Sequence, residues 1–312
     1  MGFQKANSLA KEGVPFLFIS DFKAQNIEVI PLEELERHNI EYCICEEYKY
    51  EEHEHFLKKS PSDFVSYKKK FDRVIEKIEA GETYILNLTQ ATNIETSLSL
   101  REIYKLANAH YKLRYKDEFV CFSPEKFIQI KDNKIHTFPM KGTINASTPN
   151  AQEKILANQK EMAEHVMIVD LLRNDLSIVS TNVAVEKFRY IQKINAGEKE
   201  LLQVSSHISG NLQEDWREHL GDILKALLPA GSISGAPKKS TLDIIENVEN
   251  YERGFFSGIF GIYDGKNFDS GVMIRFIERS SKGYIYKSGG GITLDSDVVL
   301  EYEELKDKIY LP

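Results

Sequence analysis

Residues 255–264 read FFSGIFGIYD, residues 267–278 read NFDSGVMIRFIE, and residues 283–291 read GYIYKSGGG. These stretches are rich in aromatic and β-branched residues, and short turns separate them, which is the pattern of strands joined in hairpins. A helical pattern follows at about residues 297–310. Hairpin-rich strands that alternate with long helices predict an α+β fold, with the helices packed outside antiparallel sheets.

The same alternation extends toward the N-terminus. Strands are predicted at residues 84–90, 119–123, 127–130, 135–138, 180–194 and 201–212. Helices are predicted at residues 63–81, 151–176, 216–228 and 238–247. No low-complexity linker or repeat divides the sequence, so we expect one compact unit with an N-terminal addition, residues 1–62.

The composition limits the kind of protein this is. The chain has 312 residues, of which 42% are hydrophobic, which is enough to bury a proper core. A net charge of −8 argues against duplex nucleic acid as a partner and leaves carboxylates for a divalent metal. The apolar run at residues 15–19 is too short to span a bilayer. We therefore expect a cytoplasmic protein with no membrane partner.

A lysine between a proline and a glycine marks the middle of the chain, where residues 137–143 read TFPMKGT. Pro139 fixes its own φ, while Phe138 and Met140 suggest apolar walls around Lys141. A lysine in such surroundings loses its proton more easily and can act as a nucleophile. The alternative is an ordinary surface lysine in a loop.

Two predicted helices carry glutamates three residues apart, which places each pair on one helix face. The pairs are Glu161 with Glu164 and Glu301 with Glu304. Two such helices can present four carboxylates across a cleft, enough for Mg²⁺ with its usual waters. Each pair alone also fits a solvated helix face, but the neighbouring residues are apolar.

The first of these helices carries a polar group on its other side. Asp170, Arg173 and Asn174 point opposite the glutamates. We interpret them as a buried structural network with no part in catalysis.

Two glycine-containing segments are suited to binding anions. Residues 228–239 read LPAGSISGAPKK and precede a helix, so their exposed N–H groups can form an anion cradle. The segment lacks the lysine placement of a P-loop, which argues against a phosphate-binding transferase. Residues 288–292, SGGGI, form a second such loop, and Arg275 can contact a carboxylate through two hydrogen bonds.

Five motifs resemble those of the chorismate-utilising enzymes, a family that includes anthranilate synthases, aminodeoxychorismate synthases, isochorismate synthases and salicylate synthases. The motifs are PMKGT (139–143), EHVMIVDLLRNDL (164–176), PAGSISGAPK (229–238), RGFFSGIFG (253–261) and GGGITLDSD (289–297). The resemblance runs from about Phe64 to the C-terminus. It implies two orthogonally packed antiparallel β-sheets with helices outside, a chorismate-binding catalytic domain at 63–312 and a reduced N-terminal segment at 1–62.

Three positions favour one branch of this family. The residue that matches Lys141 is typically alanine in anthranilate synthases and lysine in aminodeoxychorismate synthases. Ile85 stands where isochorismate and salicylate synthases have a lysine base, and residues 87–89, NLT, look like the aminating branch. The resemblance therefore favours aminodeoxychorismate synthase component I, the large subunit of para-aminobenzoate synthase in folate synthesis. The alternative is anthranilate synthase component I.

The resemblance also implies roles for single residues. Glu164 and Glu304 match Mg²⁺ ligands, supported through water by Glu161 and Glu301. Glu125 matches a general acid for the C4 hydroxyl; the alternative for it is a salt bridge with the adjacent lysine.

Lys141 would be the nucleophile, and the remaining positions imply contacts with the substrate. These positions are Arg275, Thr143, Ser234, Gly235, Lys238, Gly289, Gly290 and Gly291. For Lys238, neutralisation of substrate charge and capping of the loop both remain open.

Ammonia must come from a partner, because no G-x-C-x-G elbow or glutaminase triad is evident in the sequence. The resemblance implies a separate glutamine amidotransferase subunit. A third possibility is a non-catalytic chorismate-binding subunit, and the presence of Glu125, Lys141 and the four glutamates argues against it.

Overall fold

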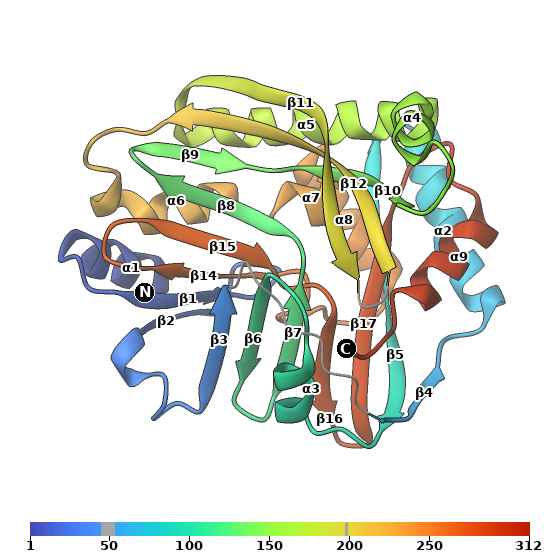
Figure 1. The fold of residues 1–312 in the computed structure, drawn as a ribbon, viewed down its shortest axis with the longest axis horizontal. Coiled ribbons are helices and arrows are strands. Elements are labelled where there is room, and N and C mark those ends of the chain that lie inside the picture. Colours follow the sequence, from blue (N-terminus) through green and yellow to red (C-terminus); the bar gives the residue numbers. More distant parts are fainter. Residues whose placement is uncertain (45–53, 197–198) are drawn as a thin grey trace.

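Two antiparallel sheets surrounded by helices form the protein (Figure 1). The structure is a computed structural model that describes residues 1–44, 54–196 and 199–312, with the side chains of 194–199 left aside. The α+β fold predicted from the sequence is confirmed. In these ranges no helix is long and apolar enough to cross a membrane.

The first sheet has nine strands within the described residues, and the listing below follows their order in space. The strands are β10 (Met140–Asn145), β12 (Lys199–Asn211), β9 (Lys134–Thr137), β8 (Lys126–Lys131), β15 (Phe268–Val272), β14 (Ile259–Tyr263), β1 (Phe16–Ser20) and β2 (Ile27–Pro31), with β11 (Thr181–Ala196) paired to β12.

The second sheet has eight strands within the same ranges, and its strands cross those of the first sheet in Figure 1. They are β13 (Gly235–Ala236), β5 (Ile85–Thr96), β17 (Gly283–Ile292), β16 (Phe276–Ser280), β7 (Phe119–Ser123), β6 (Tyr111–Tyr115) and β3 (Ile40–Ile44), with β4 (Leu57–Ser60) paired to β5.

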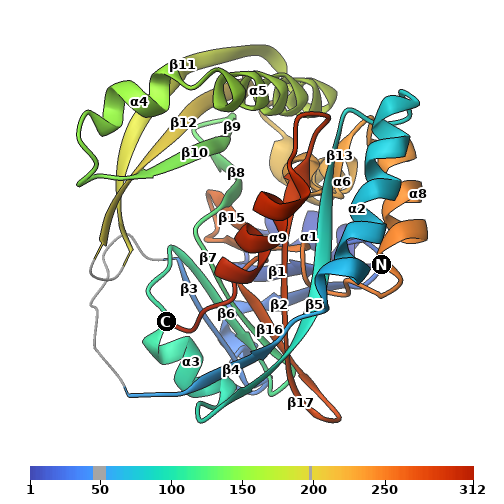
Figure 2. The same ribbon diagram turned by 90° about the vertical axis from the view of Figure 1, so that its right-hand side faces the viewer.

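The helices lie around the sheets, and Figure 2 shows α2, α8 and α9 gathered beside β5 and β17. The helices are α1 (Gly2–Lys11), α2 (Phe64–Glu79), α3 (Leu100–Leu106), α4 (Ala151–Ala157), α5 (Gln159–Val179), α6 (Leu220–Leu227), α7 (Gly231–Ser234), α8 (Lys238–Glu249) and α9 (Val298–Asp307), with 3₁₀ turns at Leu32–Glu34 and Trp216–His219.

Alternate residues of β1 enter two different cores, as the two-residue period of a strand requires. Leu17 and Ile19 pack with Leu113 and Phe119 of the second sheet, so this core joins the two sheets. Phe16 and Phe18 belong to a larger core that includes residues of the surrounding helices. The N-terminal segment 1–62 thus contributes strands to both sheets, since β1 and β2 pair in the first and β3 and β4 in the second.

Two helix predictions were wrong in detail. Residues 2–11 form α1, although the sequence pattern indicated no element there; the helix contacts α6, and Ala6 and Ala10 are fully buried. The single helix predicted at 151–176 is two helices, because Asn158 is extended and its side chain accepts a hydrogen bond from the Glu161 N–H at 3.1 Å. This N-cap starts α5 and positions its glutamates.

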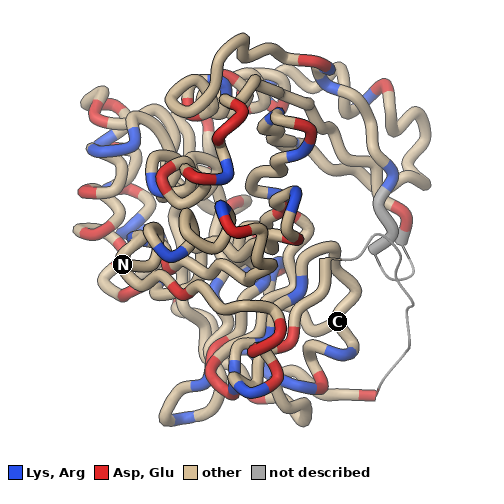
Figure 3. Tube along the Cα trace, turned by 90° about the vertical axis from the view of Figure 1, so that its left-hand side faces the viewer, with Lys and Arg blue, Asp and Glu red and all other residues tan. Residues whose placement is uncertain are grey.

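Positive and negative side chains are interspersed along the trace (Figure 3). The correction that concerns charge lies on α5, where Asp170, Arg173 and Asn174 are exposed instead of buried. Arg173 and Asp170 form a surface ion pair at 3.1 Å. The buried face of this helix carries Asp175 in their place, with apolar residues around it.

Candidate active site

Two crossings of the chain from one sheet to the other position Glu125 and Arg275. Glu125 lies between β7 of the second sheet and β8 of the first, and Arg275 lies between β15 of the first and β16 of the second. The crossings are joined, because the Val272 N–H donates to the Glu125 carbonyl at 3.0 Å and the Phe122 N–H donates to the Arg275 carbonyl at 3.2 Å. The two side chains are therefore fixed at the junction of the sheets.

A cavity of about 280 Å³ opens at this junction. The predicted site residues that line it are Glu125, Lys141, Thr143, Ser234, Gly235, Arg275, Gly289, Gly290, Gly291 and Glu304. These residues come from widely separated parts of the sequence, and the fold brings them together. A second hollow of about 500 Å³ lies among residues of α8 and the segment 249–253, and none of the predicted site residues lines it.

Lys141 stands near the start of β10, and its Nζ forms an ion pair with Glu164 Oε2 at 3.1 Å. Burial alone would lower the lysine pKa, but Glu164, Glu304 and Glu161 outweigh it, so the pKa is raised. The expectation that apolar walls ease loss of the proton is therefore wrong for the free protein, because carboxylates surround the amine.

The glutamates of α5 border the cavity on the Lys141 side. A Cβ built on Gly142 would lie 3.2 Å from Glu161 Oε2, so this glycine leaves room for the carboxylate. Burial raises the pKa of Glu161, and the nearby charge of Glu164 raises it further. Glu304 acts in the same direction, which indicates that the carboxylates of α5 and α9 face a common space.

The glutamates of α9 approach the cavity from the other side. The Asp297 side chain caps this helix by accepting from two backbone N–H groups at 2.9 and 3.0 Å. Burial raises the pKa of Glu301, whose carboxylate accepts from Ser296 at 2.9 Å. Burial also disfavours charge on Glu304, but the Lys308 ammonium at 2.7 Å outweighs it and lowers the pKa.

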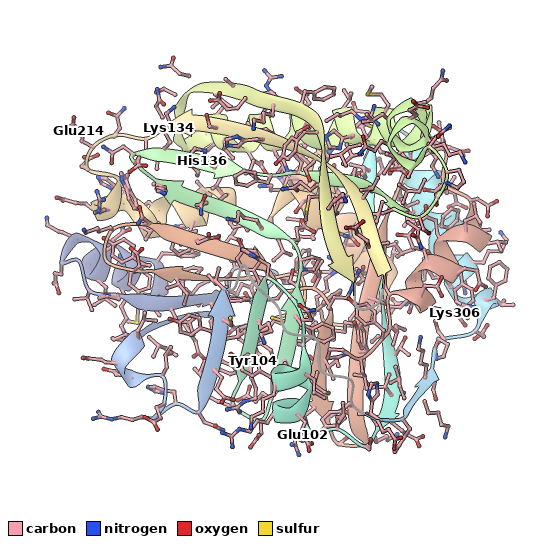
Figure 4. All side chains as sticks on the ribbon, in the orientation of Figure 1. Glu102, Tyr104, Lys134, His136, Glu214 and Lys306 are labelled. Atoms are coloured by element: carbon pink, nitrogen blue, oxygen red, sulfur yellow. The ribbon has the colours of Figure 1, made fainter. Side chains whose placement is uncertain are left out.

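The outer side of α9 is different, since Lys306 lies at the periphery of the molecule (Figure 4). A Cβ on Gly290 would lie 3.2 Å from Glu301 Oε2, so that glutamate, by contrast, borders the cavity. The two α9 glutamates therefore lie on the inward side, as their three-residue spacing requires.

The donor set of the two pairs suits Mg²⁺, which binds one or two carboxylates and keeps several waters. In the described part of the chain, no three His, Cys, Asp or Glu side chains meet as a closed metal-binding group. The carboxylates of Glu161 and Glu164 nevertheless repel each other in partly buried positions, and a divalent cation would relieve that repulsion. The residues thus fit an open, water-completed Mg²⁺ site.

Glu125 has the environment of a general acid. Burial raises the pKa of its carboxyl, while a hydrogen bond with Ser232 and the charges of Lys141, Arg275 and Lys308 act in the opposite direction. The adjacent lysine does not pair with it, because Lys126 Nζ contacts Asp269 at 2.9 Å. A raised pKa keeps more of this carboxyl protonated toward neutral pH.

The glycine run at 289–291 is the end of strand β17 and not a loop, which corrects the prediction. It pairs with β5, where Gly291 lies opposite Asn87 and Gly289 opposite Thr89. A Cβ on Gly289 would lie 2.6 Å from the Leu88 carbonyl oxygen, so a side chain there would not fit. The glycines bring backbone close to the cavity and leave space beside Lys141.

The predicted anion cradle forms a short helix, α7, followed by a tight contact with β5. Gly235 has a φ of +132°, and a Cβ on it would lie 1.9 Å from the Ile85 carbonyl oxygen, so only glycine fits. Ser234 is fully buried, and its hydroxyl donates to the Ala230 carbonyl at 2.9 Å. This hydroxyl holds the turn, and the backbone around Gly235 forms the cavity wall.

Lys238 is the predicted substrate residue that the structure places outside the cavity lining. Its Nζ donates to the Leu227 carbonyl at 3.0 Å and contacts Asp175 Oδ1 at 3.3 Å. Of the two readings of Lys238, these contacts correspond to holding the loop.

Several cavity residues were missed by sequence reasoning. They are Asn87, Lys126, Gln203, Ser232, Lys287 and Lys308. Lys308 follows Glu304 by four residues on the last helix and its Nζ donates to the Gly289 carbonyl at 2.8 Å; that helical spacing could have identified it. Lys287 offered no such signal, because its contacts with Glu278 and the Arg253 carbonyl depend on the fold.

Known proteins share both the sequence and the fold. The family described as chorismate binding enzyme matches residues 18–311. A Haemophilus influenzae protein named "Uncharacterized PabA-like protein" is 46% identical over 99% of this chain and 95% of its own length. Aminodeoxychorismate synthase component 1 of Bacillus subtilis is 33% identical over 77% of this chain and 54% of its own length. The crystal structure of anthranilate synthase component I from Streptococcus pneumoniae, 26% identical, matches with a TM-score of 0.69 over 81% of this chain and 58% of that chain.

Proposed function

The chain belongs to the family of chorismate-binding enzymes, and we propose that it aminates chorismate at C4 to give 4-amino-4-deoxychorismate. Family membership confirms the resemblance predicted from the sequence. The observation that carries the finer proposal is the Lys141 amine, which lies in the same cavity as the raised-pKa carboxyl of Glu125. Ile85 lines that cavity as well and offers no base to activate water.

Glu125 is the proposed general acid. The C4 hydroxyl of chorismate is a poor leaving group until it receives a proton, and a carboxyl with a raised pKa retains one to give. Proton transfer from Glu125 lets the oxygen leave as water and leaves Glu125 as a carboxylate.

Lys141 is the proposed nucleophile. Its ammonium must first lose a proton, and Glu164 at 3.1 Å is within reach of that proton. The neutral amine then forms a bond to the ring while the electrons of the conjugated diene shift and the C4–O bond breaks. Ammonia next bonds to C4, the electrons shift back, and the lysine leaves with its bonding pair. Two easier substitutions replace one difficult one.

The carboxylates of chorismate need positive charge and N–H donors. Arg275 lines the cavity, and its guanidinium has a hydrogen bond to the Tyr310 hydroxyl at 3.2 Å that fixes its orientation. Glu164 and Glu304, with Glu161 and Glu301 through water, would hold Mg²⁺. Bound there, the ion supplies positive charge for the ring carboxylate.

The ammonia source is proposed to be a separate glutamine amidotransferase subunit, with free ammonia as the substitute in vitro. The product would serve p-aminobenzoate and folate synthesis. The second candidate is anthranilate synthase component I, which the similarity to the Streptococcus pneumoniae structure favours.

The proposal is tested by incubating the purified chain with chorismate, Mg²⁺ and an ammonium salt and identifying the product by mass spectrometry. We expect a product that keeps the enolpyruvyl arm, and its loss in Lys141→Ala. Anthranilate, which is aromatic and fluorescent, would instead support the second candidate. A chain that leaves chorismate unchanged in the presence of ammonium would refute both.

A further inference from the structure

Asn87 lines the cavity, yet the steps above give its side chain no role. Its Oδ1 atom is shielded from solvent and has no hydrogen-bond donor in the described part of the chain. Its backbone carbonyl accepts from Arg253 Nη2 at 2.6 Å, so the strand is held in place there. A buried acceptor without a partner costs about 1–3 kcal/mol, and in a ligand cavity such a group points to a missing donor.

The register of the second sheet shows where this amide lies. Asn87 is directly opposite Gly291, and the side chains of directly opposed residues share one face with Cβ atoms about 4.5–5.5 Å apart. A Cβ on Gly291 would lie 3.6 Å from Lys141 Nζ and 3.5 Å from Ile85 Cδ1. Ile85 shares the face of Asn87, because the two are two residues apart on β5.

The absence of a side chain at Gly291 therefore leaves a small space between three groups: the amide of Asn87, the methyl groups of Ile85 and the amine of Lys141. The amine has its printed partner in Glu164, so the acceptor of Asn87 is left for another donor. The space adjoins the group that the incoming nucleophile must displace.

We propose that Asn87 forms the ammonia-binding subsite of the reaction, an inference that rests on the proposed function. Ammonia has three N–H bonds and one lone pair, so an enzyme can hold it for attack by accepting its hydrogens. The Asn87 Oδ1 supplies such an acceptor, and the apolar wall of Ile85 disfavours the charged ammonium ion.

In the step concerned, the nitrogen lone pair of the held ammonia forms the bond to C4. The ring electrons shift back, and the bond to Lys141 breaks with its electron pair returning to the lysine nitrogen. The extra proton on the new amine passes to the Glu125 carboxylate, which lost its proton in the first step. All atoms and charges are then accounted for.

Chorismate itself is a less suitable partner for this acceptor. Its carboxylates have no hydrogens to donate, and they are better matched by the cations of the cavity, Arg275, Lys287 and Lys308. An acceptor next to Lys141 suits a ligand with several N–H donors.

The test is a steady-state comparison of wild type with Asn87→Leu, which keeps the approximate shape and removes the acceptor. With chorismate saturating, we expect the KM for ammonium salt to rise about five- to tenfold, as loss of one hydrogen bond predicts. The KM for chorismate should change less than twofold. Without ammonia, the rate at which chorismate becomes attached to Lys141 should be unchanged.

Gln90→Leu is the matched control. Gln90 is a buried amide on the same strand whose Nε2 also lacks a partner, but it lies on the opposite face of β5. It should leave the KM for ammonium unchanged. Asn87→Ala repeats the test without added methyl groups, and far-UV circular dichroism verifies the fold of each variant.

An unchanged KM for ammonium in a folded Asn87 variant would overturn the inference. So would equal increases in both KM values, or slower attachment of chorismate to Lys141, since these results assign Asn87 to the substrate or the lysine. Failure of the wild type to aminate chorismate would refute the proposed function, which the wild-type assay reports separately.

Discussion

Arg253→Met tests how the walls of the cavity are held. The Arg253 guanidinium binds Glu249 through Nε at 2.8 Å and Nη2 at 2.6 Å, and both side chains are only 2% exposed. It also donates to the carbonyls of Asn87 at 2.6 Å and Ile233 at 3.0 Å, which belong to two walls of the cavity. One side chain thus joins β5 to α7.

The methionine variant leaves the Glu249 carboxylate buried without its cation, and breaking a buried ion pair in this way costs about 3–5 kcal/mol. Thr89 still donates to Glu249 through its N–H and hydroxyl, both at 2.8 Å, so we expect the lower end of that range. Glu249→Gln in the same chain removes the stranded charge and should restore about 1–3 kcal/mol.

Urea unfolding measures both effects, followed by circular dichroism and by the fluorescence of Trp216, the sole tryptophan and a buried one. The midpoint should fall in Arg253→Met while the slope stays constant. A loss below about 1 kcal/mol, or no recovery in the double variant, would refute the view that Arg253 neutralises a buried charge.

Two further predictions concern titrating groups. Glu125→Gln should lower kcat about 10²–10⁴-fold and leave the KM for chorismate nearly unchanged; it should also abolish the decline in rate that the wild type shows as pH rises through the raised pKa of Glu125. A variant with full activity would exclude Glu125 as the acid. Burial lowers the pKa of His165 to about 4, with Arg189 adding to the effect. The folded pKa is below the unfolded value of 6.5, so this stability is complete above pH 6.5 and is lost as pH falls toward 4. His165→Asn should therefore lose about 3 kcal/mol less than wild type between about pH 7 and pH 4; equal losses in urea unfolding would contradict the assignment.

Much of the site could be predicted from the motifs, because they carry residues whose chemistry is local to them. Glu125, Lys141, Arg275 and the glycines at 289–291 all line one cavity. The charge state of Lys141 could not be predicted, since it depends on Glu164 and Glu304, which only tertiary packing brings near.

The fold shows the same division. Residues 267–278 keep their apolar pattern throughout, so they indicated one strand, whereas Arg275 has a φ of +50° and the chain changes sheets there. Helix α1 was missed because its stability comes from contacts with α6, where a Cβ on Gly221 would lie 1.9 Å from the Phe3 carbonyl oxygen. Tertiary packing decides such elements.

The attachment of chorismate to Lys141 is the most direct test of the central claim, that this amine attacks the ring. The chain is incubated with chorismate and Mg²⁺ without ammonia, quenched in acid, and analysed by intact and peptide mass spectrometry. We expect a gain equal to chorismate less one water on the peptide that contains Lys141, and its disappearance when ammonium is added before the quench. No gain under these conditions, or the same gain in Lys141→Ala, would contradict the account.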